Sequence, residues 1–399
     1  AEQALGHPID VIAGREEARL IYLGVANGLA AGDDSRLVVD IGGGSTELIV
    51  GEGFTPRLRE SLHMGCVSMS RSQFPDGKIT AKLMDRAELS GALEVRPVRE
   101  TFRRAGWRMA VGSSGTIKSI AAVVAAEGWC RDGISAASLS KVREALVDFR
   151  DVARIDLKGL SEERRPVFAG GVAVLRSVFT NLRIDHMQVS GEALREGVIY
   201  EMMGRIRHED VRERTVAALS QRFAIDEEHA GRVQGTALTL YGHVAQSWEL
   251  TDPNYPSLLG WAARLHEIGL MVSHSQYQKH GAYLLRNADL SGFSRQEQAV
   301  LALLALGHRR KFPARDAFIG LPAPLQRCAR RLCIILRLAV LIHRGRSPTA
   351  KPFPMFSADG DHLSLRFPDG WLADHPLTHI ELETEAQRLA AADVTLEFA

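Results

Sequence analysis

The sequence predicts an α/β domain that is preceded by the incomplete end of a related α/β half and followed by an all-α domain and a small α+β tail. Three observations predict this organisation. Strand-like and helix-like segments alternate around glycine-rich loops in residues 31–205, long amphipathic segments fill residues 206–347, and short alternating segments return in residues 348–399. A chain of 399 residues can accommodate two or three apolar cores.

Residues 1–30 are interpreted as the remnant of a first half-domain. The Ile-Asp-Val-Ile run at residues 9–12 has the pattern of a strand, and residues 16–28 have that of a helix. The sequence starts with neither Met nor a basic, apolar signal segment, so we expect it to begin within a domain and to expose the edge strand at residues 9–12.

The next segment has the element order of a known half-domain. The predicted elements are strands at residues 37–41, 47–50 and 57–61, a helix at 81–104, a strand at 108–111 and a helix at 117–126. A three-stranded meander followed by helix, strand and helix is expected of one half of a ribonuclease-H-like unit. Such halves usually occur in pairs around a phosphate cleft.

The character of the sequence changes beyond about Met202, and we place the domain boundary near Arg205. The amphipathic helical pattern continues to Arg346 and predicts a separate α-helical domain. In the tail, residues 362–367, 379–382 and 394–398 alternate like strands and predict a small α+β domain.

Composition narrows the class of protein. Apolar residues make up 45% and charged residues 24% of the chain, and the most apolar run, Leu332–Ile342, is interrupted by Arg337, so no transmembrane helix is expected. The four cysteines lack C-x-x-C spacing, which favours a reducing, cytoplasmic location. A net charge of +1 excludes a basic field over the whole protein, so we expect no nucleic-acid partner. Any polyanion would have to bind to a local basic patch.

The strongest motif is D-I-G-G-G-S-T-E at residues 40–47, between two predicted strands. Consecutive glycines at Gly42, Gly43 and Gly44 let backbone N–H groups turn inward and form an anion-binding nest, while Asp40 can hold a divalent cation. The motif therefore favours phosphate and magnesium. A glycine-rich hairpin without a ligand is the alternative.

Two further segments support an anion site. The G-S-S-G-T loop at residues 112–116 follows a strand and opens a helix, where free N–H groups and the helix dipole attract anions. The G-R-E-E-A-R-L segment at residues 14–20 begins another helix, with Glu16 and Glu17 in its first turn. Those two acids, taken alone, could simply complement the helix dipole.

Together these segments resemble the exopolyphosphatase and guanosine pentaphosphate phosphatase family. The segments that carry the resemblance are, in family order, residues 14–20, 40–47, 64–67 (M-G-C-V), 112–116 and 193–197 (A-L-R-E-G). The resemblance covers essentially the whole chain and is closer in the α/β part than after about Ile206. It implies an actin-like phosphatase domain, a degenerate HD-like helical domain and, in the cell, a homodimer.

The resemblance also implies roles for individual residues. Glu17 matches the family's catalytic glutamate, which positions or deprotonates the attacking water, and Asp40 and Glu47 match carboxylates associated with Mg²⁺. The implied phosphate contacts are Gly42, Gly43, Gly44, Ser45, Thr46, Ser113, Ser114, Gly115 and Thr116. Positioning and charge neutralisation are what phosphoryl transfer chiefly needs, so no covalent enzyme intermediate is required.

The chain departs from the family pattern near Ser190. It has the order Gly191-Glu192 where acid before glycine is more usual, which argues against a phosphate contact there. The segment at residues 195–197 is interpreted as a structural helix start.

The predicted helical domain contains histidines and a group of basic residues. His243, His266-Glu267, His280 and His308 follow an order similar to that of metal-binding HD hydrolases, but those need Asp where Glu267 stands, so we expect a channel wall without a metal. The expected polyanion track consists of Arg309, Arg310, Lys311, Arg344 and Arg346, with ordinary solvated charges as the alternative.

The function expected from the sequence is Mg²⁺-dependent hydrolysis of the terminal phosphate of inorganic polyphosphate. Hydrolysis of guanosine pentaphosphate (pppGpp) to the tetraphosphate (ppGpp) is the nearest alternative, and a non-catalytic polyphosphate or alarmone binder is another. Gly44 and His274-Ser275 favour the polyphosphatase branch. Because a first phosphate loop is missing before Gly14, we expect residues 1–399 alone to be nearly inactive and about 100 upstream residues to restore activity.

Overall fold

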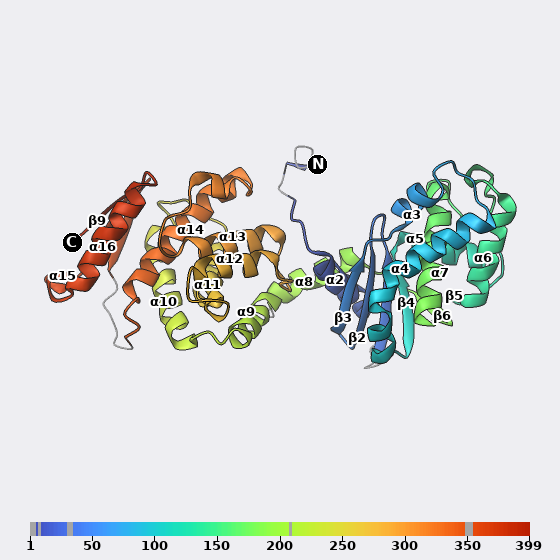
Figure 1. Ribbon diagram of the computed structural model, residues 1–399, viewed down its shortest axis with the longest axis horizontal. Helices are drawn as coiled ribbons and strands as arrows, with labels where there is room; N and C mark the ends of the chain where they lie inside the picture. The colour runs from blue at the N-terminus through green and yellow to red at the C-terminus, as the bar shows by residue number, and fades with distance from the viewer. Residues whose placement is uncertain (1–4, 7–8, 30–34, 207–209, 348–353) are drawn as a thin grey trace. The chain divides into compact units, whose positions relative to one another are not determined.

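The computed structural model describes residues 5–6, 9–29, 35–206, 210–347 and 354–399, and Figure 1 shows its helices and strands. The chain forms two compact units, Ala13–Glu209 and Asp210–Ala399, the second of which also includes Ala1–Ile12. The predicted strand at residues 9–12 is wrong. Those residues form no strand, and Val11 instead accepts a backbone hydrogen bond from Arg295 (2.8 Å) in the helical unit.

The α/β unit is built on a six-stranded sheet of order β3-β2-β1-β4-β6-β5. Its strands are β1 (Ser35–Ile41), β2 (Thr46–Glu52), β3 (Thr55–Leu62), β4 (Met109–Ser113), β5 (Ile134–Ser135) and β6 (His186–Val189). The first three form an antiparallel meander, and β4 and β6 continue the sheet in parallel with β1. This is the order of a ribonuclease-H-like half, so the predicted fold class is confirmed.

Helices cover both faces of this sheet. One face packs on a large core to which four long helices contribute: α4 (Ala81–Ala105), α5 (Ser114–Ala126), α6 (Ala136–Phe149) and α7 (Arg165–Leu182), next to the short α3 (Cys66–Gln73). The other face presents Val38, Ile49 and Val111 to helix α2 (Gly14–Gly28).

Helix α8 (Leu194–Ile206) packs against α2 in the same unit. Two glycines allow this close packing, because a Cβ on Gly24 would lie 2.1 Å from the Ala193 carbonyl oxygen and one on Gly197 would lie 1.8 Å from that of Leu20. The helix that we assigned to the remnant of a first half is thus an integral layer of this α/β unit.

The second unit consists of helices and a small sheet around one apolar core, and Figure 1 shows its helices. The helices before the C-terminal segment are α9 (Val211–Arg222), α10 (Glu227–Val244), α11 (Tyr255–Leu265), α12 (Tyr277–Asn287), α13 (Arg295–Gly307) and α14 (Ala323–Ile342). The chain ends with β7 (Met355–Asp359), β8 (His362–Arg366), α15 (Trp371–Asp374), α16 (Pro376–Ala390) and β9 (Thr395–Phe398). Phe356, Leu363 and Leu382 belong to the core that the helices share, so the tail packs as part of this unit.

One of the three strands predicted for residues 348–399 is wrong. Residues 379–382 alternate like a strand but lie inside helix α16, whose buried residues are Leu382, Glu385 and Leu389. A spacing of three and four residues is that of one helix face, and packing on the core outweighed the local alternation. The strand at Met355–Asp359 was not predicted. None of the described helices has the length and apolarity needed to cross a lipid bilayer.

Candidate active site

Polar side chains form a row across the end of the α/β sheet. Asp40 of β1 is paired with Glu47 of β2 and with Ser113 of β4, and Glu47 is paired with Ser61 of β3. Directly paired residues project from the same face of a sheet. Ser113 Oγ donates to Asp40 Oδ2 (2.7 Å), and Ser61 Oγ donates to Glu47 Oε1 (2.8 Å).

Strand alternation places this row on the face that α2 covers. Val38, Ile49 and Val111 pack against α2, and each lies two residues from a member of the row. The first turn of α2 reaches the row, because a Cβ on Gly14 would lie 2.7 Å from the Cβ and Oγ atoms of Ser61. Only glycine permits this approach, which brings Glu17 to the row.

The two acids at the start of α2 have different environments. Glu16 is buried and forms an ion pair with Arg19 (2.8 Å), which also binds Glu201 of α8 (3.0 Å). Glu17 is half-buried, and its pKa is raised first by burial and then by the negative charge of Asp40. Glu16 therefore holds α2 to α8, while Glu17 faces the carboxylates of the sheet.

Burial and neighbouring negative charges raise the proton affinity of these carboxylates. The pKa of Glu47 is raised to about 7, first by burial and then by the charges of Glu17 and Asp40, against the hydrogen bonds of Ser61 and Ser45. Burial also raises the pKa of Asp40. A bound cation would relieve this repulsion. Among the described residues these acids do not form a group of three ligand atoms within 4.8 Å. Asp40 and Glu47 could hold Mg²⁺ only together with water, several molecules of which this ion usually keeps.

The buried charge of Glu47 leads to a stability prediction. The folded-state pKa of about 7 exceeds the ordinary 4.5, so the stabilisation by this group is complete below pH 4.5 and is lost as the pH rises through 7. At pH 8 without divalent cations, Glu47→Gln should therefore raise the free energy of unfolding by up to about 3 kcal/mol, with little change at pH 4. Urea unfolding in EDTA at both pH values measures this difference. A less stable variant at pH 8 would contradict the assignment.

The first glycine loop uses two of its carbonyls and the N–H of Gly42, which donates to the Ser45 carbonyl (2.9 Å), within the protein. The carbonyl of Gly42 accepts from Cys66 N–H (2.9 Å), and that of Gly43 accepts from Val67 and Ser68 at the start of α3. Among the described residues no backbone carbonyl accepts from Gly43 or Gly44 N–H, and both glycines are exposed. This loop can therefore offer N–H donors to an anion.

Several hydroxyl groups that were expected to bind phosphate are already used within the protein. Thr46 is fully buried and donates to the Met64 carbonyl (2.6 Å), so its hydroxyl proton is used within the protein. Ser114 Oγ accepts from Ile41 N–H (3.3 Å), and Ser113 is bonded to Asp40. These side chains shape the site, and the backbone N–H groups of the loops, together with the O–H of Ser114, can serve as donors for an anion.

The second loop opens helix α5, and two cations from outside the motif, Arg164 and Lys118, lie near it. A Cβ on Gly115 would lie 2.1 Å from an Arg164 guanidinium nitrogen, so this side chain rests against the helix start. Lys118, one turn into α5, donates to the Gly191 carbonyl (2.6 Å). Its positive charge opposes the rise in the pKa of Asp40 that burial causes. The Arg164-Arg165-Pro sequence that opens α7 was the available signal for the first cation.

The segment after β6 has a structural role. Ser190 Oγ accepts from Glu192 N–H (3.0 Å), and the Glu196 carboxylate accepts from Ala193 N–H (2.9 Å) at the start of α8. Together with the close packing of Gly197 on α2, these contacts give residues 190–197 internal partners and hold the start of α8 against α2.

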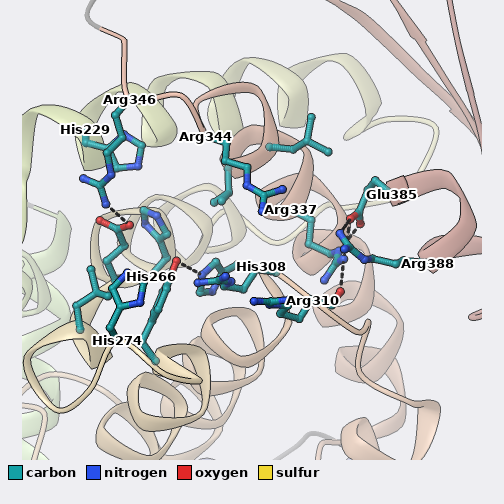
Figure 2. Close-up of a pocket in the computed structure, with 16 residues that line it drawn as sticks. His229, His266, His274, His308, Arg310, Arg337, Arg344, Arg346, Glu385 and Arg388 are labelled. Carbon is teal, nitrogen blue, oxygen red and sulfur yellow. Dashed lines mark hydrogen bonds and ion pairs between the residues drawn. The ribbon is translucent and has the colours of Figure 1, made fainter. Parts of the chain in front are cut away.

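The predicted polyanion track lies in the other unit. A cavity of about 220 Å³ (Figure 2) is lined by four of the track's residues, Arg309, Arg310, Arg344 and Arg346. Lys311 lines a neighbouring cavity. Arg344 pairs with Glu381 (3.1 Å), Arg346 pairs with Asp226 (3.1 Å), and Arg309 lies over the Tyr277 ring (4.6 Å). Arg310 and Lys311 are exposed and have no carboxylate partner among the described residues, so these two cations of the predicted track remain available to a polyanion.

Two solved structures resemble part of the chain. A crystal structure of an exopolyphosphatase-like protein is 26% identical with a TM-score of 0.46, covering 51% of this chain and 71% of that one. The Aquifex aeolicus PPX-GPPA enzyme is 25% identical with a TM-score of 0.42, covering 50% of this chain and 67% of that one.

Comparison with sequence families and relatives identifies the chain. Residues 1–206 match the Ppx/GppA phosphatase family, and residues 211–386 match Ppx/GppA phosphatase, domain III, which meets the division at Asp210. Guanosine-5'-triphosphate,3'-diphosphate pyrophosphatases of Vibrio vulnificus and Photobacterium profundum are 37% and 38% identical over 97% of this chain and 77% of their own length. The chain therefore belongs to the Ppx/GppA phosphatase family and is a hydrolase of phosphoric anhydrides.

Proposed function

We propose that the protein removes the terminal 5′-phosphate of guanosine pentaphosphate. The observation that carries the chemistry is the Glu17, Asp40 and Glu47 cluster beside two backbone loops that offer N–H donors. The substrate is favoured by the relatives named for it, which are up to 38% identical over 97% of the chain. This reverses the preference drawn from the sequence, which placed inorganic polyphosphate first.

Each part of the site has a role in the proposed reaction. Asp40 and Glu47 would hold Mg²⁺, which would supply positive charge to the phosphate oxygens. The N–H groups of the first loop and of the α5 start would orient the terminal phosphate, with Arg164 as an added cation. Glu17 would accept a hydrogen bond from the attacking water, and its raised pKa makes it a stronger base than an ordinary carboxylate.

Initial-rate assays decide between the two substrates. Phosphate release by the full-length protein is measured with guanosine pentaphosphate and with long-chain polyphosphate, each in Mg²⁺ and in EDTA. We expect kcat/KM to be at least about tenfold higher for guanosine pentaphosphate, a difference of about 1.4 kcal/mol in transition-state stabilisation, and activity to vanish in EDTA. A higher kcat/KM on polyphosphate would contradict the proposal and support the exopolyphosphatase function expected from the sequence.

Polyphosphate hydrolysis is the second candidate, and Arg310 and Lys311 favour it because they are exposed cations without carboxylate partners among the described residues. Replacing Arg309, Arg310 and Lys311 together by Gln should weaken long polyphosphate more than tripolyphosphate, since a longer chain carries more charges for these cations to bind. The salt dependence of KM should fall as well. Equal losses on both substrates, or no loss on either, would remove these residues from the substrate path.

A further inference from the structure

A buried cluster in the helical unit brings together potential metal ligands from two distant segments. His229 lies in α10, while His266 and Glu267 follow α11, and each offers a ligand atom within 4.8 Å of the others. Figure 2 shows His229 and His266 at the same end of the cavity, and their ring centroids are 5.8 Å apart. The exposed fractions of the three residues are 3%, 1% and 8%.

Two imidazole nitrogens in this cluster are buried without a partner. His266 Nδ1 lies 2.7 Å from the Ala263 carbonyl, and since a carbonyl only accepts, Nδ1 carries the proton and Nε2 keeps its lone pair. His266 Nε2 and His229 Nδ1 are excluded from solvent and have no hydrogen-bond partner among the described residues. A histidine that donates one N–H to a carbonyl and leaves the other nitrogen bare has the arrangement of a metal ligand.

The carboxylate of the cluster is held in place by an arginine. Arg346 binds Glu267 Oε1 and also pairs with Asp226 Oδ2 (3.1 Å). The other oxygen of Asp226 accepts a hydrogen bond from the backbone N–H of His229 (3.0 Å). The same guanidinium thus fixes Glu267 against the start of the helix that carries His229. An outer partner of this kind orients a ligating carboxylate and leaves its second oxygen available.

We propose that His229, His266 and Glu267 bind one transition-metal ion of the Zn²⁺, Mn²⁺ or Co²⁺ class. Two imidazoles and one carboxylate suit these ions rather than Mg²⁺, which prefers oxygen ligands. Three protein ligands leave a coordination position open. The cavity there is also lined by Arg309, Arg310 and Arg344, so an anion such as inorganic phosphate is the class of ligand that this position takes.

The sequence argued against a metal because Glu267 stands where the HD hydrolases have Asp, and the histidines considered there did not include His229. His243 is exposed, and its Nδ1 accepts from Phe356 N–H (3.3 Å), while His280 does not line the cavity. His308 lines it, but its Nε2 lies 3.4 Å from the Tyr277 hydroxyl. His229 belongs to a different helix and no spacing rule connects it to His266, so only the fold brings the two together.

The test measures metal binding without relying on activity. The full-length Asp40→Asn/Glu47→Gln protein, in which the proposed Mg²⁺ ligands are removed, is stripped with a chelator and titrated with Zn²⁺ and with Co²⁺. We expect about one ion per chain and visible Co²⁺ absorption bands typical of nitrogen and oxygen ligation. In that background His229→Gln and Glu267→Gln should each weaken Zn²⁺ binding by at least about 100-fold, while His280→Gln, the matched control, should bind normally.

Circular dichroism first establishes which variants are folded, and Glu267→Gln alone decides the outcome if His229→Gln is unfolded. Inorganic phosphate should change the Co²⁺ spectrum of the parent protein and leave that of Glu267→Gln unchanged. Failure of the folded parent to bind a stoichiometric ion would overturn the proposal. Equal Zn²⁺ affinity in the parent and in folded Glu267→Gln would overturn it too. Neither result would affect the proposed hydrolysis, whose residues lie in the other unit.

Discussion

Replacing Glu17 by Gln is expected to lower kcat for phosphate release by about 10²- to 10⁴-fold while KM changes little. The amide keeps nearly the same volume but cannot accept a proton from water. Since Glu17 is half-buried at the row of sheet carboxylates, its loss removes the group that faces the reacting phosphate in the proposed reaction. Initial rates with guanosine pentaphosphate in saturating Mg²⁺ provide the measurement.

Glu16→Gln is the matched control, since it makes the same chemical change one residue earlier. Glu16 forms a buried ion pair with Arg19, so this variant should unfold at a lower temperature but retain kcat when assayed while folded. The assignment would be reversed if Glu16→Gln were inactive as a folded protein and Glu17→Gln turned over at the normal rate.

Glu385→Ala is expected to destabilise the helical unit by about 3 to 5 kcal/mol, because it leaves a buried guanidinium without its counter-charge. Arg337 of α14 is 2% exposed and binds both oxygens of Glu385 (2.6 and 2.9 Å). Its remaining N–H groups bind the carbonyls of Gly307 and Arg310, so it also fixes the loop that carries the cavity cations. Thermal and urea unfolding of the full-length protein measure the loss.

The control replaces both partners with apolar residues of similar size. Arg337→Met/Glu385→Leu should recover much of the stability, because no buried charge is left unpaired. If Glu385→Ala unfolded like the parent protein, the pair would not be a buried structural ion pair and the loop would need another anchor.

The catalytic half of the protein could largely be predicted from its sequence. Glycines and strand patterns are local signals, so residues 40–47 and 112–116 identified both loops, and the meander, helix and strand order predicted the sheet. Local signals were insufficient where packing competes with alternation, as at residues 379–382, which joined a helix because Leu382 and Leu389 reach the core on one helix face.

The sequence by itself determined the family, the two phosphate loops and the candidate acid Glu17. Only the tertiary structure decided which acid of the pair is free, because Glu16 is bound to Arg19 and that pairing depends on α8. It also brought Arg164 to Gly115 and His229 to His266. The physical reason is that a motif records the backbone conformation of neighbouring residues, whereas a side chain's partner, its burial and hence its proton affinity depend on segments far away in the chain.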